Sequence, residues 1–288
     1  MNRGYCGETR MVLSHYQADV LLKAREDGLE KAKVSPDLGL TKVEAALADD
    51  GVMFPGGELL DWPAVERISG ATRSCFLVCG GEAEEVRALS EMTGLVLSLV
   101  PTGGAPTLFV SGFPMHRIKG TDPHRDTRRK IEAISPIRGR VLDTATGLGY
   151  TAIEAARTAE EVTTIELDPA VLEIARVNPW SKELFDNAKI KQIIGDATVE
   201  VEKLPAASFN RIIHDPPTLK LAGEMYSGAL YSEFRRVLTR RGRTFHYVGD
   251  PDSALGARNT RGVIRRLREA GFRRVSRAPE AFGVVAEP

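Results

Sequence analysis

The sequence predicts an α/β fold, with a doubly wound parallel sheet in residues 115–288 and a smaller, strand-rich α+β domain in residues 1–114. The first observation behind this prediction is the regular alternation of short β-branched runs with helical segments after Gly139, which is typical of parallel sheets flanked by helices. The second is the pattern between residues 32 and 110, where Gly and Pro divide the chain into short apolar runs. A chain of 288 residues can bury one large core and one small core.

The N-terminal domain is expected to begin with a helix over residues 16–27, with Ser14 as its N-cap and Gly28 at its end. Short strands should follow, with one further helix near residues 82–93. The pattern is consistent with a domain that orients a substrate or with one that braces the fold.

The second half contains seven expected strands. In chain order they lie at residues 140–143, 162–166, 189–194, 210–214, 244–248, 272–276 and 283–286. A helix is expected between each consecutive pair of the first six strands, so these six strands should run parallel. The last strand follows its neighbour after a short turn at Pro279, which permits an antiparallel pairing at the edge of the sheet.

The segment after the first of these strands favours a ligand site. Asp143 closes the strand, and Gly147 and Gly149 form a tight turn before the next helix, a geometry that places backbone N–H groups against a ligand. Glu166 ends the second strand 19 residues after Gly147, where a carboxylate can accept hydrogen bonds from both hydroxyls of an unmodified ribose. The negative charge of Asp143 disfavours a pyrophosphate and favours a ligand with an α-amino group and a sulfonium.

The pattern D-x-x-T-G-x-G from Asp143 to Gly149, followed by I-E-x-D-P from Ile165 to Pro169, resembles the class I S-adenosylmethionine-dependent methyltransferases. The resemblance implies a Rossmann-like, seven-stranded sheet and S-adenosyl-L-methionine as the cofactor. The cofactor-binding residues that it implies are Thr121, Asp143, Thr144, Gly147, Gly149, Glu166, Leu167, Asp196, Ala197 and Asp215. In that family the glycine turn holds the methionine part, the acidic residue after the second strand holds the ribose, and the residues after the third strand hold the adenine.

Asp215, Pro216 and Pro217 follow the fourth strand and resemble the [DNS]-P-P-[YFW] motif of amino-directed methyltransferases. In this reading they are the catalytic residues, because the Asp215 carboxylate and the Pro216 carbonyl can accept both N–H bonds of an exocyclic amine. The aromatic fourth position of the motif is Thr218 here. Either another ring stacks on the base or the target is not a flat base. The candidates for another ring are Tyr226, Tyr231, His246 and Tyr247. His214 is expected to be a packed, hydrogen-bonded residue rather than a base.

The catalytic half also resembles an archaeal group of methyltransferases assigned to cytosine N4 of small-subunit ribosomal RNA. The matching segments are GLGYTAIEAA, NPWS, HDPP and FHYVGDP. This resemblance implies an N-methyltransferase acting on an exocyclic nucleobase amine in RNA. The alternative is an aminopropyltransferase of the polyamine-synthase type that uses decarboxylated S-adenosylmethionine. Asp143 disfavours a dinucleotide-dependent oxidoreductase, and the intact D-P-P disfavours a non-catalytic binding module.

The charge distribution supports both leading hypotheses. Residues 1–114 carry 10 basic and 16 acidic side chains, and this acidic half would suit a polyamine. Residues 235–277 carry 13 arginines against Asp250, Asp252 and Glu269, and this segment is either a surface that binds RNA phosphates or a solvated helix face. The sequence contains no long apolar run and no apolar N-terminal signal, so a cytoplasmic location without membrane contact is expected. No metal site is predicted.

Overall fold

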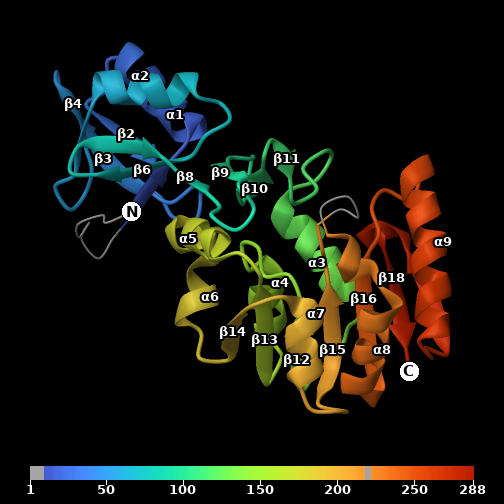
Figure 1. Cartoon of the computed structure of the whole chain (residues 1–288). Helices are drawn as coiled ribbons and strands as arrows, with labels where there is room; N and C mark the ends of the chain where they lie inside the picture. The colour runs from blue at the N-terminus through green and yellow to red at the C-terminus, as the bar shows by residue number, and fades with distance from the viewer. Residues whose placement is uncertain (1–9, 218–221) are drawn as a thin grey trace. The chain divides into compact units, whose positions relative to one another are not determined.

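The computed structural model describes residues 10–217 and 222–288, so Thr218 lies outside the described residues. The chain forms two compact units, Met1–Pro123 with Ala170–Lys182 and His124–Pro169 with Glu183–Pro288 (Figure 1). The first unit therefore includes a segment that follows the second strand of the large sheet in the sequence. Chain order alone, with a boundary expected at residue 114, does not anticipate that segment.

The first unit is built from small antiparallel sheets and two helices before residue 115. Its elements are β1 (Met11–Leu13), α1 (His15–Glu26), β2 (Lys31–Val34), β3 (Val43–Leu47), β4 (Gly51–Met53), β5 (Leu59–Asp61), α2 (Trp62–Gly70), β6 (Phe76–Cys79), β7 (Glu82–Glu85), β8 (Arg87–Leu89), β9 (Val96–Val100), β10 (Thr107–Val110) and β11 (Phe113–Pro114). Its sheets have the orders β1-β6-β7, β2-β3-β4-β5 and β11-β10-β9-β8. The later segment adds α5 (Pro169–Val177) and the 3-10 turn η1 (Pro179–Ser181).

Helix α1 confirms the prediction at the N-terminus. Ser14 is the N-cap, and its backbone N–H and hydroxyl both donate to the Gln17 Oε1 atom, at 2.9 and 2.8 Å. Ala18 and Leu21 are buried on the inner face of the helix. Gly28 follows with a positive φ of 67°, a backbone conformation that glycine adopts readily at a helix end.

The helix expected at residues 82–93 is wrong, because the chain forms β7 and β8 there. Gly80 and Gly81, both with positive φ, close a two-residue hairpin between β6 and β7, in which Cys79 pairs with Glu82. This backbone twist matches that of antiparallel strands. The Gly-Gly signal therefore outweighs the helix propensity of the glutamates that follow it.

The second unit carries the large sheet and its helices. Its elements are α3 (Pro123–Ala133), β12 (Arg140–Asp143), α4 (Tyr150–Ala156), β13 (Glu161–Glu166), α6 (Lys182–Asp186), β14 (Ile190–Ile194), α7 (Ala197–Glu200), η2 (Val201–Lys203), β15 (Phe209–His214), η3 (Gly223–Tyr226), α8 (Gly228–Val237), β16 (Leu238–Tyr247), α9 (Ala254–Glu269), β17 (Arg274–Ala278), η4 (Pro279–Ala281) and β18 (Gly283–Glu287).

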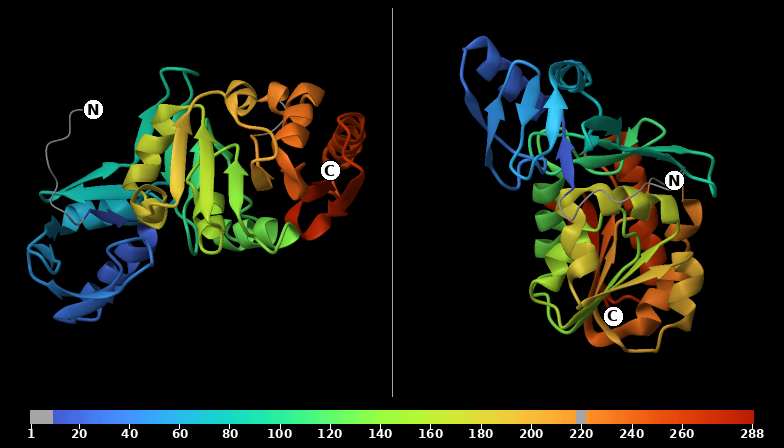
Figure 2. Two further views of the ribbon diagram at one scale, coloured as in Figure 1. Left: turned by 90° about the horizontal axis from the view of Figure 1, so that it is seen from below. Right: turned by 90° about the vertical axis from the view of Figure 1, so that its left-hand side faces the viewer.

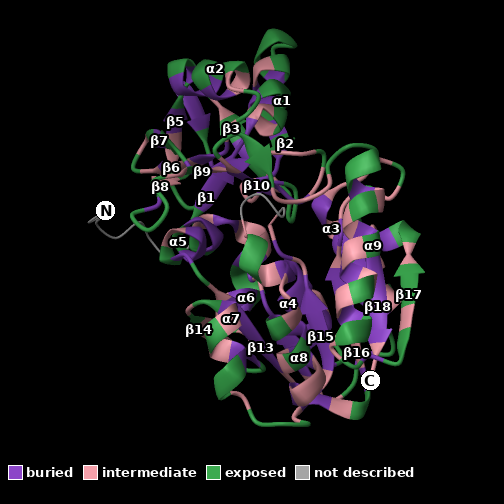
Figure 3. Ribbon diagram, turned by 45° about the vertical axis from the view of Figure 1, so that its right-hand side comes forward, coloured by how far each residue is buried: buried purple, intermediate pink, exposed green. Residues whose placement is uncertain are grey.

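The large sheet confirms the predicted fold class. Its seven strands have the order β14-β13-β12-β15-β16-β18-β17; the first five run parallel, and β18 pairs antiparallel with both neighbours. In the right-hand view of Figure 2 the green helices α3 and α4 lie on one side of the sheet, and the gold and orange helices α7 and α8 lie on the other. The strands β12, β13, β15 and β18 are buried along most of their length (Figure 3), as expected for a sheet covered on both faces, whereas the edge strands β14 and β17 are more exposed.

The topology fixes where a ligand can bind. The register places Asp143 of β12 beside Thr164 of β13 and Ile213 of β15, so these three strands end at the same edge. In open α/β sheets the ligand crevice lies at the carboxyl ends of the strands, where the strand order reverses. That reversal falls here between β12 and β15. Within the described part of the chain, we find no helix with the length and apolar character that crossing a bilayer requires.

Candidate active site

The glycine turn and the end of β13 are joined by the Glu166 carboxylate. The Gly147 N–H donates to Glu166 Oε2 at 2.8 Å, and the Asp168 N–H donates to Oε1 at 3.1 Å. Burial raises the pKa of Glu166, and these backbone N–H groups oppose that effect by stabilising the charged form. The 19-residue spacing thus brings the two predicted residues together. Contact of Glu166 with a ribose remains a prediction.

The two glycines of this turn differ in the space around the position that a Cβ atom would occupy. Gly149 has a φ of +78°, and a Cβ atom there would lie 2.7 Å from Leu184 Cδ2. Gly147 has a φ of +54°, but a Cβ atom there would meet nothing within 4 Å. The space in front of Gly147 is open, and a ligand could approach its backbone there.

Asp143 is fully buried at the end of β12. Its Oδ2 atom accepts hydrogen bonds from the hydroxyls of Thr151 at 3.0 Å and Thr164 at 3.1 Å, while its Oδ1 atom has no hydrogen-bond partner in the described structure. Burial, only partly opposed by the threonines, raises the pKa of Asp143 to about 7. The two threonine hydroxyls therefore occupy Oδ2 of Asp143, and only Oδ1 can accept a hydrogen bond from the predicted α-amino group.

Thr144 and His214 form a buried link between β12 and β15. The His214 Nε2 atom donates to the Met225 carbonyl at 2.7 Å, so in the neutral ring Nδ1 accepts from the Thr144 hydroxyl at 2.6 Å. Burial lowers the pKa of His214 to about 4, which keeps the ring neutral. These contacts agree with the prediction of a packed, hydrogen-bonded histidine. They also occupy the hydroxyl of Thr144, a residue predicted to bind the cofactor.

The predicted adenine-binding residues lie beyond the ends of β13 and β14. The Asp196 Oδ1 atom caps α7 by accepting from the Thr198 N–H at 2.8 Å, and Ala197 is buried. Leu167 is 45% exposed, and Ile194, which pairs with Glu166 in the register, is 60% exposed. Sequence reasoning missed Ile194. Two exposed apolar side chains beside the ribose-binding candidate form a surface on which a flat base can lie.

The charged centre of the site is a buried ion triad. The Lys130 ammonium, from α3, lies 2.6 Å from Asp215 Oδ2 and 2.8 Å from Asp126 Oδ2. Burial alone would lower the pKa of Lys130, but the two carboxylates raise it above its usual value. Burial raises the pKa of Asp215, and the ammonium opposes that effect. Sequence reasoning singled out Asp215 but missed its two partners, for which the i, i+4 spacing of Asp126 and Lys130 is the available signal.

Two of the four candidate rings border this triad. The Tyr247 ring centroid lies 5.0 Å from the Lys130 Nζ atom, and the Tyr226 hydroxyl donates to the Pro217 carbonyl at 3.0 Å. The other two rings are fully buried, with the Tyr231 hydroxyl bonded to His246 Nε2 at 2.6 Å. Tyr226 is itself only 5% exposed, so the half-buried Tyr247 is the candidate ring that a substrate could contact.

The remaining predicted site residues are Thr121 and Pro216. Thr121 belongs to the first unit, where its hydroxyl donates to the neighbouring Asp122 carbonyl at 3.4 Å, so its contact with a cofactor stays a prediction. Pro216 is buried directly after Asp215. Among the described residues there is no group of three or more His, Cys, Asp or Glu side chains arranged to hold a metal ion.

Together these residues form an acidic strand edge. Asp143, Glu166 and Asp215 end or follow adjacent strands, and Asp126 adds a fourth carboxyl group beside Asp215. Lys130 compensates one of these charges, and its ammonium is shared between two carboxylates. Such an edge can bind a cationic sulfonium or ammonium group, and carboxylates can orient an amine and take up its proton.

The large sheet, with this acidic edge at the carboxyl ends of its strands, has the class I S-adenosylmethionine-dependent methyltransferase-like fold. A spermidine synthase solved with the transition-state analogue AdoDATO aligns with a TM-score of 0.57 and 19% identity, covering 69% of this chain and 71% of that one. The chain belongs to the family of the uncharacterized protein MJ1233 of Methanocaldococcus jannaschii, with which it is 49% identical over 81% of its own length and 80% of that protein. Residues 129–226 match the family model described as Conserved hypothetical protein 95.

A relative with a named activity corrects the predicted function. Polyamine aminopropyltransferase 2 of Streptomyces coelicolor is 27% identical over 67% of this chain, and the match spans 36% of that protein's length. The prediction of an RNA N-methyltransferase acting on cytosine N4 is contradicted by this relationship. The glycine turn and the acidic strand ends suit any sulfonium nucleoside, so they do not distinguish methyl transfer from aminopropyl transfer. The alternative reading is the better supported one.

Proposed function

We propose that this chain is an aminopropyltransferase of the polyamine-synthase type, which transfers the aminopropyl group of decarboxylated S-adenosylmethionine to an amine. The observation that carries the proposal is the acidic edge around Asp215. S-adenosylmethionine carries a carboxylate that these acidic residues would repel. The decarboxylated donor lacks it, and the charged groups of its aminopropyl part are the sulfonium and a terminal ammonium, both positive. The Lys130 ammonium is already shared between Asp126 and Asp215, so it is a poor partner for a substrate carboxylate.

The surroundings of Asp143 are compatible with aminopropyl transfer from a donor that has no α-amino acid group. A full methionine part would use Asp143 to bind its α-amino group. In the structure one Asp143 oxygen is occupied by Thr151 and Thr164, and the pKa of Asp143 is raised to about 7 by burial. The residue thus has a role inside the fold, and its presence after β12 does not require an α-amino acid ligand.

In the proposed reaction the lone pair of an amine attacks the aminopropyl carbon that is bonded to the sulfonium sulfur. A C–N bond forms and a C–S bond breaks, the electron pair of that bond goes to sulfur, and methylthioadenosine leaves as a neutral thioether. The amine nitrogen then loses one proton. Asp215 is the carboxylate placed to orient the amine and to accept that proton, Lys130 holds Asp215 in position, and the Tyr247 ring can lie against a second ammonium group.

The test is to incubate the purified protein with decarboxylated S-adenosylmethionine or S-adenosylmethionine and a panel of linear diamines and triamines. We expect methylthioadenosine and an aminopropylated amine with the decarboxylated donor only. Asp215→Asn should lower kcat with the decarboxylated donor by about 10²-fold or more. Methyl transfer from S-adenosylmethionine with no methylthioadenosine formed from either donor would overturn the proposal.

A further inference from the structure

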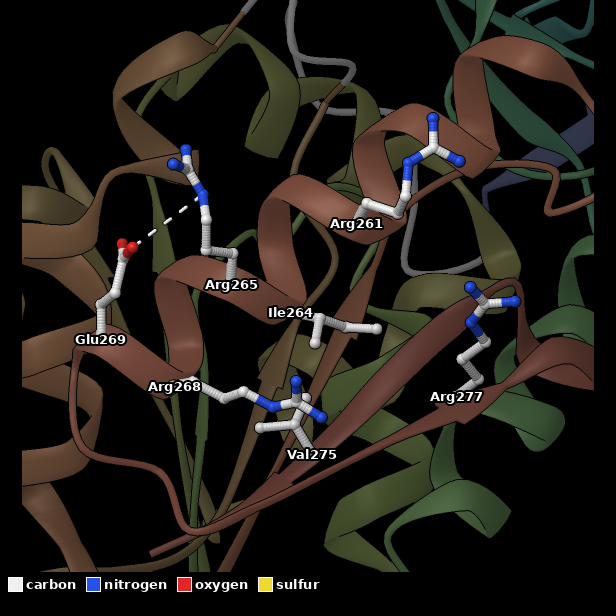
Figure 4. Close-up of a pocket in the computed structure, with 7 residues that line it drawn as sticks. All are labelled: Arg261, Ile264, Arg265, Arg268, Glu269, Val275 and Arg277. Carbon is white, nitrogen blue, oxygen red and sulfur yellow. Dashed lines mark ion pairs between the residues drawn. The ribbon is translucent and has the colours of Figure 1, made fainter.

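A basic groove lies on the outer surface of the second unit, between α9 and β17 (Figure 4). It has a volume of about 590 Å³. Its lining residues are Arg261, Ile264, Arg265, Arg268, Glu269, Val275 and Arg277. All four arginines are exposed, and Ile264 and Val275 are half-buried between them. The groove is separate from the acidic strand edge described above, since it shares no residue with it.

The groove has a surplus of positive charge. Arg265 has an acidic neighbour, with its Nε atom 3.9 Å from Glu269 Oε1, and both side chains of this pair are more than half exposed. An ion pair of this length at the surface contributes little. In the described part of the chain, no ion pair involves Arg261, Arg268 or Arg277. Three guanidinium groups are thus available to an anion.

The arrangement of these groups suits an extended polyanion. Arg261, Arg265 and Arg268 follow one another at i, i+4 and i+7 on α9, and Arg261 and Arg268 are therefore about 10 Å apart along the helix axis. Figure 4 shows the four guanidinium groups spread along the groove rather than turned toward one point. A single small anion could reach only one or two of them, whereas a chain of phosphates could reach all four.

We propose that this groove binds the phosphate backbone of a nucleic-acid strand and does not read its base sequence. Guanidinium groups donate two parallel hydrogen bonds to a phosphate, which suits arginine for this contact. Among the residues that the structure describes, no aromatic ring lines the groove, so they do not offer the stacking that many single-strand binding proteins use. The inference rests on the charge and shape of the groove and is independent of the proposed transferase activity.

The experiment measures the anisotropy of a fluorescent 20-nucleotide single-stranded RNA, titrated with the full-length protein at several salt concentrations. The test variant is R261A/R268A/R277A. Each phosphate contact on a single strand contributes about −0.7 to the slope of log K against log salt, so this variant should reduce the magnitude of the slope by about 2 and weaken binding at least about tenfold at low salt. Single-stranded DNA of the same length should show the same salt slope and the same loss of affinity in the variant, because RNA and DNA both have a phosphate backbone.

The matched control is R138A/R240A/R241A, which removes the same charge from exposed arginines outside the groove. It should keep the wild-type slope, and both variants should keep the wild-type thermal unfolding midpoint. Equal losses in the two variants would mean that only net charge matters, and an unchanged slope in the test variant would mean that the arginines are solvated; either result overturns the proposal. Binding to phosphatidylserine–phosphatidylcholine vesicles without binding to the oligonucleotides would also overturn it.

Discussion

The turn around Gly147 and the triad around Lys130 stabilise carboxylates by different physical means. At the turn, Glu166 accepts hydrogen bonds from two backbone N–H groups within about 20 residues of chain. At the triad, Asp215 is neutralised by an ammonium group that comes from 85 residues earlier in the chain. The first arrangement is local in sequence, and the second requires the tertiary fold to bring α3 against the end of β15.

This difference has consequences for sensitivity to mutation. Backbone N–H groups are present whatever the side chains are, so a substitution at the turn acts mainly through shape. The triad holds two carboxyl groups and one ammonium group away from water, so loss of the Lys130 ammonium leaves two carboxyl groups without a cation in a buried place. We therefore expect charge-changing substitutions to have larger effects at the triad than at the turn.

The largest effect is expected for Lys130→Met. Removing the ammonium leaves Asp126 and Asp215 close together and without a cation, and the free energy of unfolding should fall by about 3–5 kcal/mol. Urea unfolding at pH 7 measures this change. The control is Lys203→Met, at a 61% exposed lysine paired with Glu200, where a change below about 0.5 kcal/mol is expected.

A variant that removes all three charges sharpens the same comparison. D126N/K130M/D215N should recover most of the stability lost by Lys130→Met, because no uncompensated charge then remains. If the triple variant were as unstable as the single one, the loss would come from packing around Lys130 and not from its charge.

The next effect concerns pH and Asp143. Its pKa is raised by burial to about 7 from an ordinary value of 3.8. Between these two values the folded state holds a proton that the unfolded state has lost, so the contribution is fully present below about pH 4 and is lost as the pH rises through about 7. Relative to Asp143→Asn, the wild type should lose up to about 4 kcal/mol of stability between pH 4 and pH 8. Parallel pH profiles for the two proteins would contradict the raised pKa.

At the glycine turn, Gly149→Ala tests shape. The new Cβ atom would overlap with Leu184, and the left-handed backbone adds a penalty, so a loss of about 2–3 kcal/mol in unfolding free energy is expected. Gly147→Ala is the control, since it has only the backbone penalty of about 1 kcal/mol. Shortening the neighbour with Leu184→Ala should reduce the difference between the two glycine variants.

The smallest effect is expected for Glu166→Gln. The amide oxygen can still accept from a backbone N–H, but the charge that strengthens hydrogen bonds from a ribose is lost. Affinity for decarboxylated S-adenosylmethionine should fall by about 1–1.5 kcal/mol in calorimetric titration. Glu160→Gln, at an exposed position, is the control and should leave the affinity unchanged. An unchanged affinity in Glu166→Gln itself would remove Glu166 from the binding site.

Much of the fold could be predicted because its signals are local. The β-branched runs, the glycine turn and the cap at Ser14 act over a few residues, and the strands of the large sheet follow from them. The hairpin at Gly80 and Gly81 shows the limit of this reasoning. The glutamates that follow these glycines favour a helix, but Glu82–Glu85 form the strand β7 because they pair with β6.

The sequence alone predicted a ligand site at this turn, since the position of Asp143 before the turn and of Glu166 at the end of the next strand is a property of chain order. Only the tertiary structure decided what surrounds those carboxyl groups. It showed that Asp143 is held by Thr151 and Thr164, and that Lys130 and Asp126 meet Asp215. The physical reason is that a motif specifies backbone geometry over short distances, whereas charge compensation in a buried site depends on segments far apart in the chain. In the proposed function, the preference for aminopropyl over methyl transfer rests on that compensation, which no short motif encodes.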